Sequence, residues 1–200
     1  MQIAACILAA GAGQRMGQDK AEVRLAGRSF VDRLLGSFAS AGTAPLFVVA
    51  RSATPGLVEA CTAHGAQLRL NPDPDRGMLS SLHVCLRALM QGPNATEIAA
   101  LFVTPVDCPR VRPETITRLA SAFDASGAPL VLPLYQGRRG HPVLFGVELF
   151  EELLAAPLDV GARAVVWAHA ADRIEIEMDD AGVLDDLDTP AAVAALQRKR

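Results

Sequence analysis

A glycine-rich stretch with two basic side chains directly follows the first apolar run of the chain. Residues 3–8 are almost wholly apolar, and the sequence then reads LAAGAGQRMGQDK from Leu8 to Lys20. Glycine lets backbone N–H groups converge on an anion, because no Cβ stands in the way. Arg15 and Lys20 add the positive charge that a phosphate chain requires. The stretch therefore predicts a phosphate-binding loop.

The spacing of this loop differs from two familiar phosphate-binding motifs. The dinucleotide fingerprint is G-x-G-x-x-G, whereas Gly11, Gly13 and Gly17 follow the spacing G-x-G-x-x-x-G. The P-loop needs a lysine directly after its last glycine and then a hydroxyl side chain. Here two residues separate Gly17 from Lys20, and no hydroxyl follows. The spacing therefore excludes a P-loop and disfavours a NAD-linked oxidoreductase.

Acidic residues form a second chemical group. Asp107 follows the apolar run 98–103, where a carboxylate is costly unless it faces a cleft or a cation. Asp185, Asp186 and Asp188 stand close together near the end of the sequence. Neighbouring carboxylates repel one another unless a cation or an arginine lies between them. We therefore expect a metal role for at least one of these three.

The rest of the chain alternates between apolar runs typical of buried strands and segments with helical spacing. We predict strands at residues 3–8, 46–50, 67–70, 98–103, 129–134, 141–145 and 173–178. We predict helices at residues 30–41, 57–64, 80–90, 113–123, 147–154 and 161–168, and a last one from residue 190. This alternation predicts an α/β fold with a mostly parallel sheet and helices on both faces. Such folds bind ligands at the carboxyl ends of their strands, so we expect the loops after Leu8, Leu70 and Val103 around one cleft.

Composition sets the class of protein. The 200 residues are 50% hydrophobic and 20% charged, which suits one globular domain spanning residues 1–200. The net charge of −3 argues against a nucleic-acid partner. We expect Cys6, Cys61, Cys85 and Cys108 to be buried free thiols. The N-terminal apolar run is too short for a signal peptide or membrane span, so we expect a cytoplasmic protein without a membrane partner.

The stretch from Leu8 to Lys20 resembles the signature L-A-A/G-G-x-x-x-R-M-G-x-x-K of nucleotidyltransferases that build NDP-sugars and nucleotide-modified cofactors. Later segments are similar to the molybdenum cofactor cytidylyltransferase-like branch of this family. They are NPDPDRGMLSSL from Asn71, VTPVDCPRVRPETI from Val103, GRRGHPVLF from Gly137, DVGARAVV from Asp159 and LDDLDTPAAVAAL from Leu184. The resemblance implies a Rossmann-like three-layer sandwich of the nucleotide-diphospho-sugar transferase type.

The resemblance also implies roles for individual residues. It implies that Arg15, Lys20 and Asp107 are catalytic, that Asp107 and Asp188 hold Mg²⁺ with Asp186 as the next candidate, and that His141 and Arg163 border the acceptor. The implied nucleotide-binding residues are Leu8, Ala9, Ala10, Gly11, Ala12, Gly13, Arg15, Lys20, Asn71, Gly77, Ser80 and Ser81. Structural roles stay open for some of them, because Ser80 and Ser81 could also cap the following helix.

The implied reaction transfers CMP from CTP to the phosphate of molybdenum-bound molybdopterin and releases pyrophosphate. Mg²⁺ would bridge the phosphates. Ala10 favours CTP because Leu-Ala-Ala-Gly accompanies the cytidylyltransferases of this family, whereas Leu-Ala-Gly-Gly accompanies the guanylyltransferases. A methyl group at Ala10 would also crowd a purine. A molybdenum hydroxylase is the implied recipient of the cytosine dinucleotide product.

The sequence leaves two alternative functions open. Cys108 stands where the family's cytidylyltransferases usually have glutamine, and Leu158 where glycine is usual. These departures leave room for a sugar-1-phosphate or another phosphorylated metabolite as the acceptor. The second alternative is a non-catalytic protein that binds a nucleotide or cofactor and delivers it. Release of pyrophosphate separates the two transferases from the delivery protein.

Overall fold

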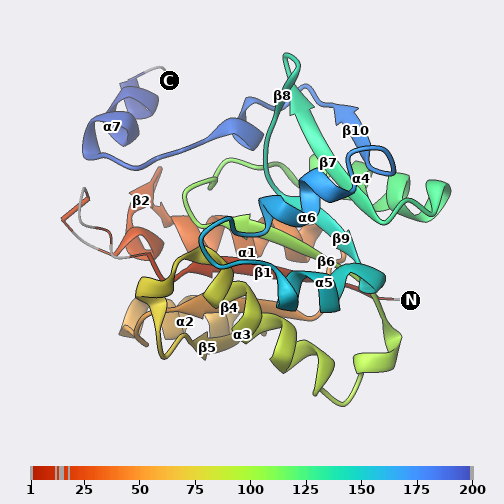
Figure 1. Ribbon diagram of the computed structural model, residues 1–200. Coiled ribbons are helices and arrows are strands. Elements are labelled where there is room, and N and C mark those ends of the chain that lie inside the picture. The colour runs from red at the N-terminus through yellow and green to blue at the C-terminus, as the bar shows by residue number, and fades with distance from the viewer. Residues whose placement is uncertain (1, 12, 14–15, 18, 199–200) are drawn as a thin grey trace.

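The computed structural model describes residues 2–11, 13, 16–17 and 19–198. Its main sheet has the strand order β10-β7-β9-β6-β1-β4-β5, with β8 paired to β7 (Figure 1). These strands are β1 (Gln2–Ala9), β4 (Leu46–Ala50), β5 (Gln67–Leu70), β6 (Ile98–Pro105), β7 (Leu130–Tyr135), β8 (Arg138–Arg139), β9 (Val143–Gly146) and β10 (Ile174–Glu177). β1 pairs in parallel with β4 and β6, as do β4 with β5 and β7 with β10. β9 runs antiparallel between β6 and β7. The prediction of a mostly parallel α/β sheet is confirmed.

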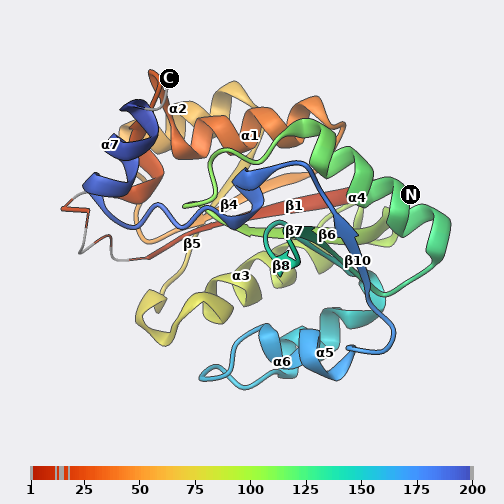
Figure 2. The same ribbon diagram turned by 90° about the horizontal axis from the view of Figure 1, so that it is seen from above.

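Helices cover both faces of this sheet, which gives three layers (Figure 2). One face carries α1 (Phe30–Ser40), α2 (Pro55–Ala63) and α4 (Pro113–Ser126), and the other carries α3 (Met78–Met90), α5 (Phe150–Ala155) and α6 (Arg163–Ala168). The last helix is α7 (Pro190–Arg198). Short 3-10 turns are η1 (Lys20–Glu22), η2 (Pro74–Arg76), η3 (Ala95–Glu97), η4 (Val147–Leu149) and η5 (Ala181–Leu184).

The central strand β1 contributes to the core on both faces because its side chains alternate. Ala5 and Ile7 belong to the cluster beneath α1, α2 and α4. Cys6 and Leu8 belong to the cluster beneath α3, α5 and α6. Burial on both faces explains why the strand reads as a continuous apolar run rather than an alternating one.

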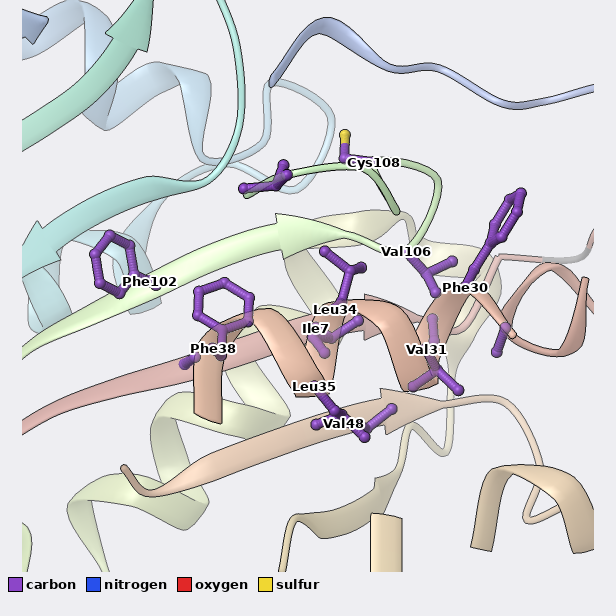
Figure 3. Packing of buried hydrophobic residues seen from close by; sticks show 14 of the residues in the cluster. Ile7, Phe30, Val31, Leu34, Leu35, Phe38, Val48, Phe102, Val106 and Cys108 are labelled. Carbon is purple, nitrogen blue, oxygen red and sulfur yellow. The ribbon is translucent and has the colours of Figure 1, made fainter. Parts of the chain in front are cut away.

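Helix α1 shows how helical spacing builds one of these layers. Ser29 caps its first turn by accepting a hydrogen bond from the Asp32 N–H at 3.2 Å. Leu34 and Phe38 lie on its buried face and point toward the sheet (Figure 3). The Phe38 ring packs against that of Phe102 on β6, with centroids 5.8 Å apart.

Several boundaries differ from the sequence prediction for identifiable reasons. α6 begins at Arg163 and not at residue 161, because Gly161 has a φ of +80° that an α-helix does not accept. The segment predicted as one helix over residues 147–154 is split into η4 and α5. A small hairpin of β2 (Arg24–Leu25) and β3 (Arg28–Ser29) was not predicted, and Ala26 and Gly27 turn it with positive φ angles.

The cysteines and the lengths of the helices bear on what the composition predicted. All four cysteines are buried free thiols, as predicted. Among the residues that the structure describes, no helix has the length and apolarity needed to cross a lipid bilayer.

Candidate active site

Topology brings the polar motifs to one edge of the sheet. β1 and β6 run in parallel with Leu8 opposite Pro105, so the residues after both strands emerge side by side. The Val106 N–H extends this pairing by donating to the Leu8 carbonyl at 3.1 Å. β9 is antiparallel to β6, with Val143 opposite Val103. Its amino end, which His141 precedes, therefore reaches the same edge.

Three aspartates converge at this edge. Asp107, Asp186 and Asp188 each offer one carboxylate oxygen, and these oxygens lie within 4.8 Å of one another. The segment that carries the last two returns across the edge between η5 and α7 (Figure 1). Its Leu187 N–H donates to the Asp107 carbonyl at 3.2 Å. The expected partnership between Asp107 and the C-terminal aspartates is therefore present in the geometry.

The ammonium of Lys20 lies between two of these carboxylates. Its Nζ is 3.1 Å from Asp107 Oδ2 and also donates to Asp188 Oδ1. Lys20 begins the turn η1, which Asp19 caps by accepting from the Ala21 N–H at 2.9 Å. The sequence predicted that Lys20 would neutralise a triphosphate. In the structure its ammonium pairs with these two aspartates, and its role toward a triphosphate stays a prediction.

Burial and repulsion between carboxylates raise the pKa of Asp107 and of Asp186. Burial raises the pKa of Asp107, and the Lys20 ammonium opposes that rise. Burial also raises the pKa of Asp186, and the negative charges of Asp188 and Asp107 raise it further. Burial would lower the pKa of Lys20, but its hydrogen bonds and charge interactions with the two aspartates raise it overall. Carboxylate oxygens in this arrangement have the donor chemistry that suits a hard divalent cation.

A cavity of about 210 Å³ opens beside the carboxylates. Its wall combines the end of β1, the loop before α3 and the end of β6, as predicted for a cleft at the strand ends. The lining residues are Leu8, Ala9, Ala10, Gly11, Lys20, Pro74, Gly77, Met78, Ser81, Pro105, Val106 and Asp107. Gly77 has a φ of +91°, which explains why glycine stands directly before α3.

Asn71 and Ser80 stabilise the loop rather than line this cavity. Asn71 is 4% exposed, and its Nδ2 donates to the hydroxyls of Ser80 at 2.8 Å and Ser81 at 2.9 Å. The Asn71 Oδ1 accepts from the Asp73 N–H at 2.9 Å. Ser80 in turn donates to the Gly77 carbonyl at 2.7 Å. This network fixes the loop whose Gly77 and Ser81 do line the cavity.

A larger cavity of about 530 Å³ adjoins the first and shares Leu8, Gly77, Met78 and Pro105 with it. Most of its lining is apolar. His141 and Arg163, the two predicted acceptor residues, are both in its wall. The Nδ1 of His141 is buried without a hydrogen-bond partner among the described residues. Burial lowers the pKa of this imidazole, which favours the neutral form. The Arg163 Nε donates to the Val160 carbonyl at 2.6 Å, and its guanidinium lies 6.0 Å from the Trp167 ring.

The sequence of this chain matches a known protein family over most of its length. A family model described as the MobA-like NTP transferase domain matches residues 5–173. The chain belongs to the MobA-like NTP transferase family. The predicted resemblance to nucleotidyltransferases is therefore confirmed at the level of the family.

Two relatives of this MobA-like chain are molybdenum cofactor guanylyltransferases. The one from Cupriavidus pinatubonensis is 30% identical over 122 residues, which are 58% of this chain and 56% of that protein. This match therefore spans little more than half of that relative. The one from Shewanella amazonensis is 25% identical over 202 residues, covering 99% of this chain and 97% of that one. The relatives support the family but not the cytidylyltransferase branch.

Two solved structures share the fold of this MobA-like chain. A nucleotidyl transferase from Methanothermobacter has a TM-score of 0.79 at 20% identity, over 99% of this chain and 97% of that one. Rv0371c from Mycobacterium tuberculosis, in complex with manganese, has a TM-score of 0.76 at 22% identity, over 100% of both chains. At these identities the likeness establishes the fold alone.

The predicted site residues fall into separate groups. Leu8, Ala9, Ala10, Gly11, Lys20, Gly77, Ser81 and Asp107 line the smaller cavity, and His141 and Arg163 line the larger one. The Gly13 carbonyl accepts from the N–H groups of Met16 at 2.9 Å and Gly17 at 3.1 Å. The predictions for Ala12 and Arg15 lie outside the described residues.

Sequence reasoning missed two features of this MobA-like site. Met78 lines both cavities. Its position directly after the predicted nucleotide-binding residue Gly77 could have indicated this. Asp185 is not part of the acidic cluster and pairs with Arg110, whose Nε donates to its Oδ2 at 2.8 Å. Nothing in the sequence distinguished Asp185 from its neighbours, because its partner lies 75 positions away.

Proposed function

We propose that this chain transfers CMP from CTP to the phosphate of molybdopterin and releases pyrophosphate. The observation that carries the proposal is the junction of the two cavities. A glycine-rich strand end, Lys20 and Asp107 line the smaller cavity, Asp186 and Asp188 lie beside Asp107, and a mostly apolar chamber adjoins this cavity. Transfer between two phosphates needs alignment and charge neutralisation more than covalent help from the protein. This arrangement supplies both.

Asp107 and Asp188 hold a divalent cation in this proposal, with Asp186 close enough to join them. The three oxygens fit such an ion, since Lys20 already places a positive charge between two of them. The manganese in the fold relative from Mycobacterium tuberculosis supports a divalent ion, and Mg²⁺ is our proposal. When bound, it would neutralise phosphate charge. Lys20 would then turn to the triphosphate, where Arg15 would add a second positive charge.

The preference for CTP rests on Ala10. This residue is 5% exposed and lines the smaller cavity at the end of β1. Its methyl group leaves less room for a base than glycine would, which favours a pyrimidine. The relatives named guanylyltransferases make GTP the competing donor. The two donors yield different dinucleotides, so the product decides between them.

Molybdopterin fits the character of the larger cavity better than a sugar phosphate does. The wall of this chamber is dominated by leucine, valine, proline and phenylalanine side chains, which suit a flat heterocycle. His141 borders this chamber with an imidazole whose pKa is lowered by burial, and Arg163 can meet an anionic group. A sugar would need more polar partners than this lining offers. In this proposal the product passes to a molybdenum hydroxylase.

A non-catalytic delivery protein would not require the acidic cluster. The pKa values of Asp107 and Asp186 are raised by burial and repulsion, so keeping these groups together is costly unless a cation offsets the cost. Perturbed acidic groups in a cleft are typical of catalytic sites. We therefore favour the enzyme over the carrier.

The experiment is product analysis. The protein is incubated with molybdopterin, its molybdenum-bound form, or glucose-1-phosphate, together with Mg²⁺ and either CTP or GTP. We expect mass spectrometry to show the cytosine dinucleotide of a molybdopterin acceptor. A guanine dinucleotide would contradict the donor assignment, and a nucleotide sugar would contradict the acceptor assignment. Nucleotide binding without any product would favour the delivery protein.

A further inference from the structure

The segment 180–188 lies against the loop that follows β6 along most of its length. At its start, the buried Asp180 carboxylate accepts from the Arg112 N–H at 3.0 Å and the Thr115 hydroxyl at 2.7 Å. At its end, the Leu187 N–H donates to the Asp107 carbonyl at 3.2 Å. The segment thus reaches the acidic cluster only by following this loop.

The packing in the middle of the segment is close. An added Cβ on Gly182 would lie 2.6 Å from the backbone carbonyl carbon and oxygen of Arg110. On the other side, the His141 N–H donates to the Val183 carbonyl at 2.8 Å. The chain there is held between the loop after β6 and the loop before β9, so its course is fixed up to Val183.

One ion pair anchors the segment between this point and the acidic cluster. The Arg110 Nε donates to Asp185 Oδ2 at 2.8 Å, and Nη2 donates to Oδ1. The Asp185 side chain is 4% exposed, whereas that of Arg110 is 34% exposed. The Cys108 thiol adds a hydrogen bond to the Asp185 carbonyl at 3.1 Å. The residue before Asp186 is therefore fixed through both its side chain and its backbone.

We propose that Arg110 and Asp185 are positioning residues, whose two-pronged ion pair orients Asp186 and Asp188 toward Asp107. The inference rests on the proposed function, since it concerns the divalent-cation site proposed above. Asp186 is one residue and Asp188 three residues beyond the anchored position, so loss of the pair would loosen the backbone that carries both carboxylates. Partners behind metal-binding groups commonly change metal affinity about 10- to 100-fold when removed.

Position and charge predict opposite effects for removing Arg110. The guanidinium is a positive charge near a cation site, so by charge alone its loss would tighten binding of a divalent ion. Loss of orientation would weaken that binding instead. The direction of the change in affinity therefore distinguishes a positioning residue from a bystander.

The test is titration of the full chain with Mn²⁺ alone, followed by electron paramagnetic resonance, for the wild type and Arg110→Met. We expect binding about 10-fold weaker in the variant. Arg118→Met is the matched control, because Arg118 also contacts the backbone ahead of the segment, at the Glu177 carbonyl, but lies outside the loop after β6. The control should bind Mn²⁺ like the wild type. Circular dichroism and thermal melting establish that each variant is folded.

Two further variants keep the inference testable if Arg110→Met does not fold. Arg110→Lys keeps the charge but loses the planar fork, so intermediate Mn²⁺ affinity is expected. The exchange of Arg110→Asp with Asp185→Arg restores a pair and should recover affinity relative to Asp185→Arg alone. In turnover, a positioning role would raise the KM for Mg²⁺ while kcat recovers at saturating Mg²⁺.

The outcomes separate this inference from the proposed function. If the wild type binds Mn²⁺ and folded Arg110 variants bind it equally well or more tightly, the positioning role is wrong and the cation site stands. If Asp107→Asn binds Mn²⁺ as tightly as the wild type, the cation site itself is wrong, and the positioning role fails with it.

Discussion

Lys20 carries the strongest prediction at the scale of single residues. Its ammonium lies between Asp107 and Asp188, where it competes with any divalent ion for the same oxygens. Lys20→Met should therefore bind Mn²⁺ at least as tightly as the wild type in the absence of nucleotide. Pyrophosphate release should nevertheless fall by about 100-fold or more, because a charge beside the triphosphate is lost. Calorimetric Mn²⁺ titration and a pyrophosphate assay measure the two effects.

The conservative variant Lys20→Arg serves as the control for that experiment, since it keeps the positive charge. It should retain more activity than Lys20→Met. Loss of Mn²⁺ binding in Lys20→Met would mean that Lys20 assembles the carboxylates rather than competing with the ion.

Ala10 carries a prediction about the choice of donor. Its side chain lines the smaller cavity, and Ala10→Gly would remove the methyl group held responsible for excluding a purine. The ratio of kcat/KM for CTP to that for GTP should fall, by up to about 10-fold for one methyl group. Ala9→Gly removes a neighbouring methyl group at the same strand end and should leave the ratio closer to that of the wild type. An unchanged ratio in Ala10→Gly would contradict the steric argument.

At the scale of elements, the segment 180–188 depends on a glycine. A Cβ at Gly182 would lie 2.6 Å from the Arg110 backbone, so Gly182→Ala must displace one of the two chains. We expect a loss of about 1–3 kcal/mol in the free energy of unfolding and weaker Mn²⁺ binding. Ala181→Ser, at an exposed position of the same segment, should change neither. Urea unfolding and Mn²⁺ titration check both variants. Wild-type stability and Mn²⁺ affinity in Gly182→Ala would show that the backbones of Gly182 and Arg110 do not approach closely.

The elements themselves were largely predictable because their signals are local. β1 is an apolar run because both of its faces are buried. Leu34 and Phe38 on α1 are spaced four residues apart because only one face of that helix is buried. The contacts within the site were less predictable, since they join distant positions. The Asn71 side chain donates hydrogen bonds to the hydroxyls of Ser80 and Ser81. No local sequence pattern distinguishes an amide that stabilises a loop in this way from one that faces a nucleotide.

The molecule as a whole is needed to build the site. Lys20 and Asp188 are 168 positions apart and share one hydrogen bond, and the loop after β6 lies between them in sequence. His141 belongs to the same edge, because β9 inserts antiparallel between β6 and β7. Local elements therefore do not suffice, and the proposed chemistry depends on the topology of the sheet.

His141 also links the site to the stability of the whole molecule. Burial lowers the pKa of the His141 imidazole from its ordinary value of 6.5. Below about pH 6.5 the imidazole is therefore protonated in the unfolded chain but still neutral in the folded chain. The contribution of His141 to stability is therefore present above about pH 6.5 and is lost as pH falls toward the lowered pKa. His141→Gln should reduce the loss of unfolding free energy between pH 7.5 and pH 5.5. Urea unfolding at both pH values measures this loss of unfolding free energy. An identical loss in the wild type and His141→Gln would contradict the burial of a neutral imidazole.

The proposed transfer at the aspartate cluster is tested by measuring pyrophosphate release with Mg²⁺, a molybdopterin acceptor and each of the four nucleoside triphosphates in turn, for the wild type and Asp107→Asn. We expect Mg²⁺-dependent release by the wild type, with CTP as the preferred donor. A folded Asp107→Asn variant should release pyrophosphate at a rate at least about 100-fold lower. Near-normal, Mg²⁺-dependent release by that variant would contradict the assignment of the cation to the three aspartates.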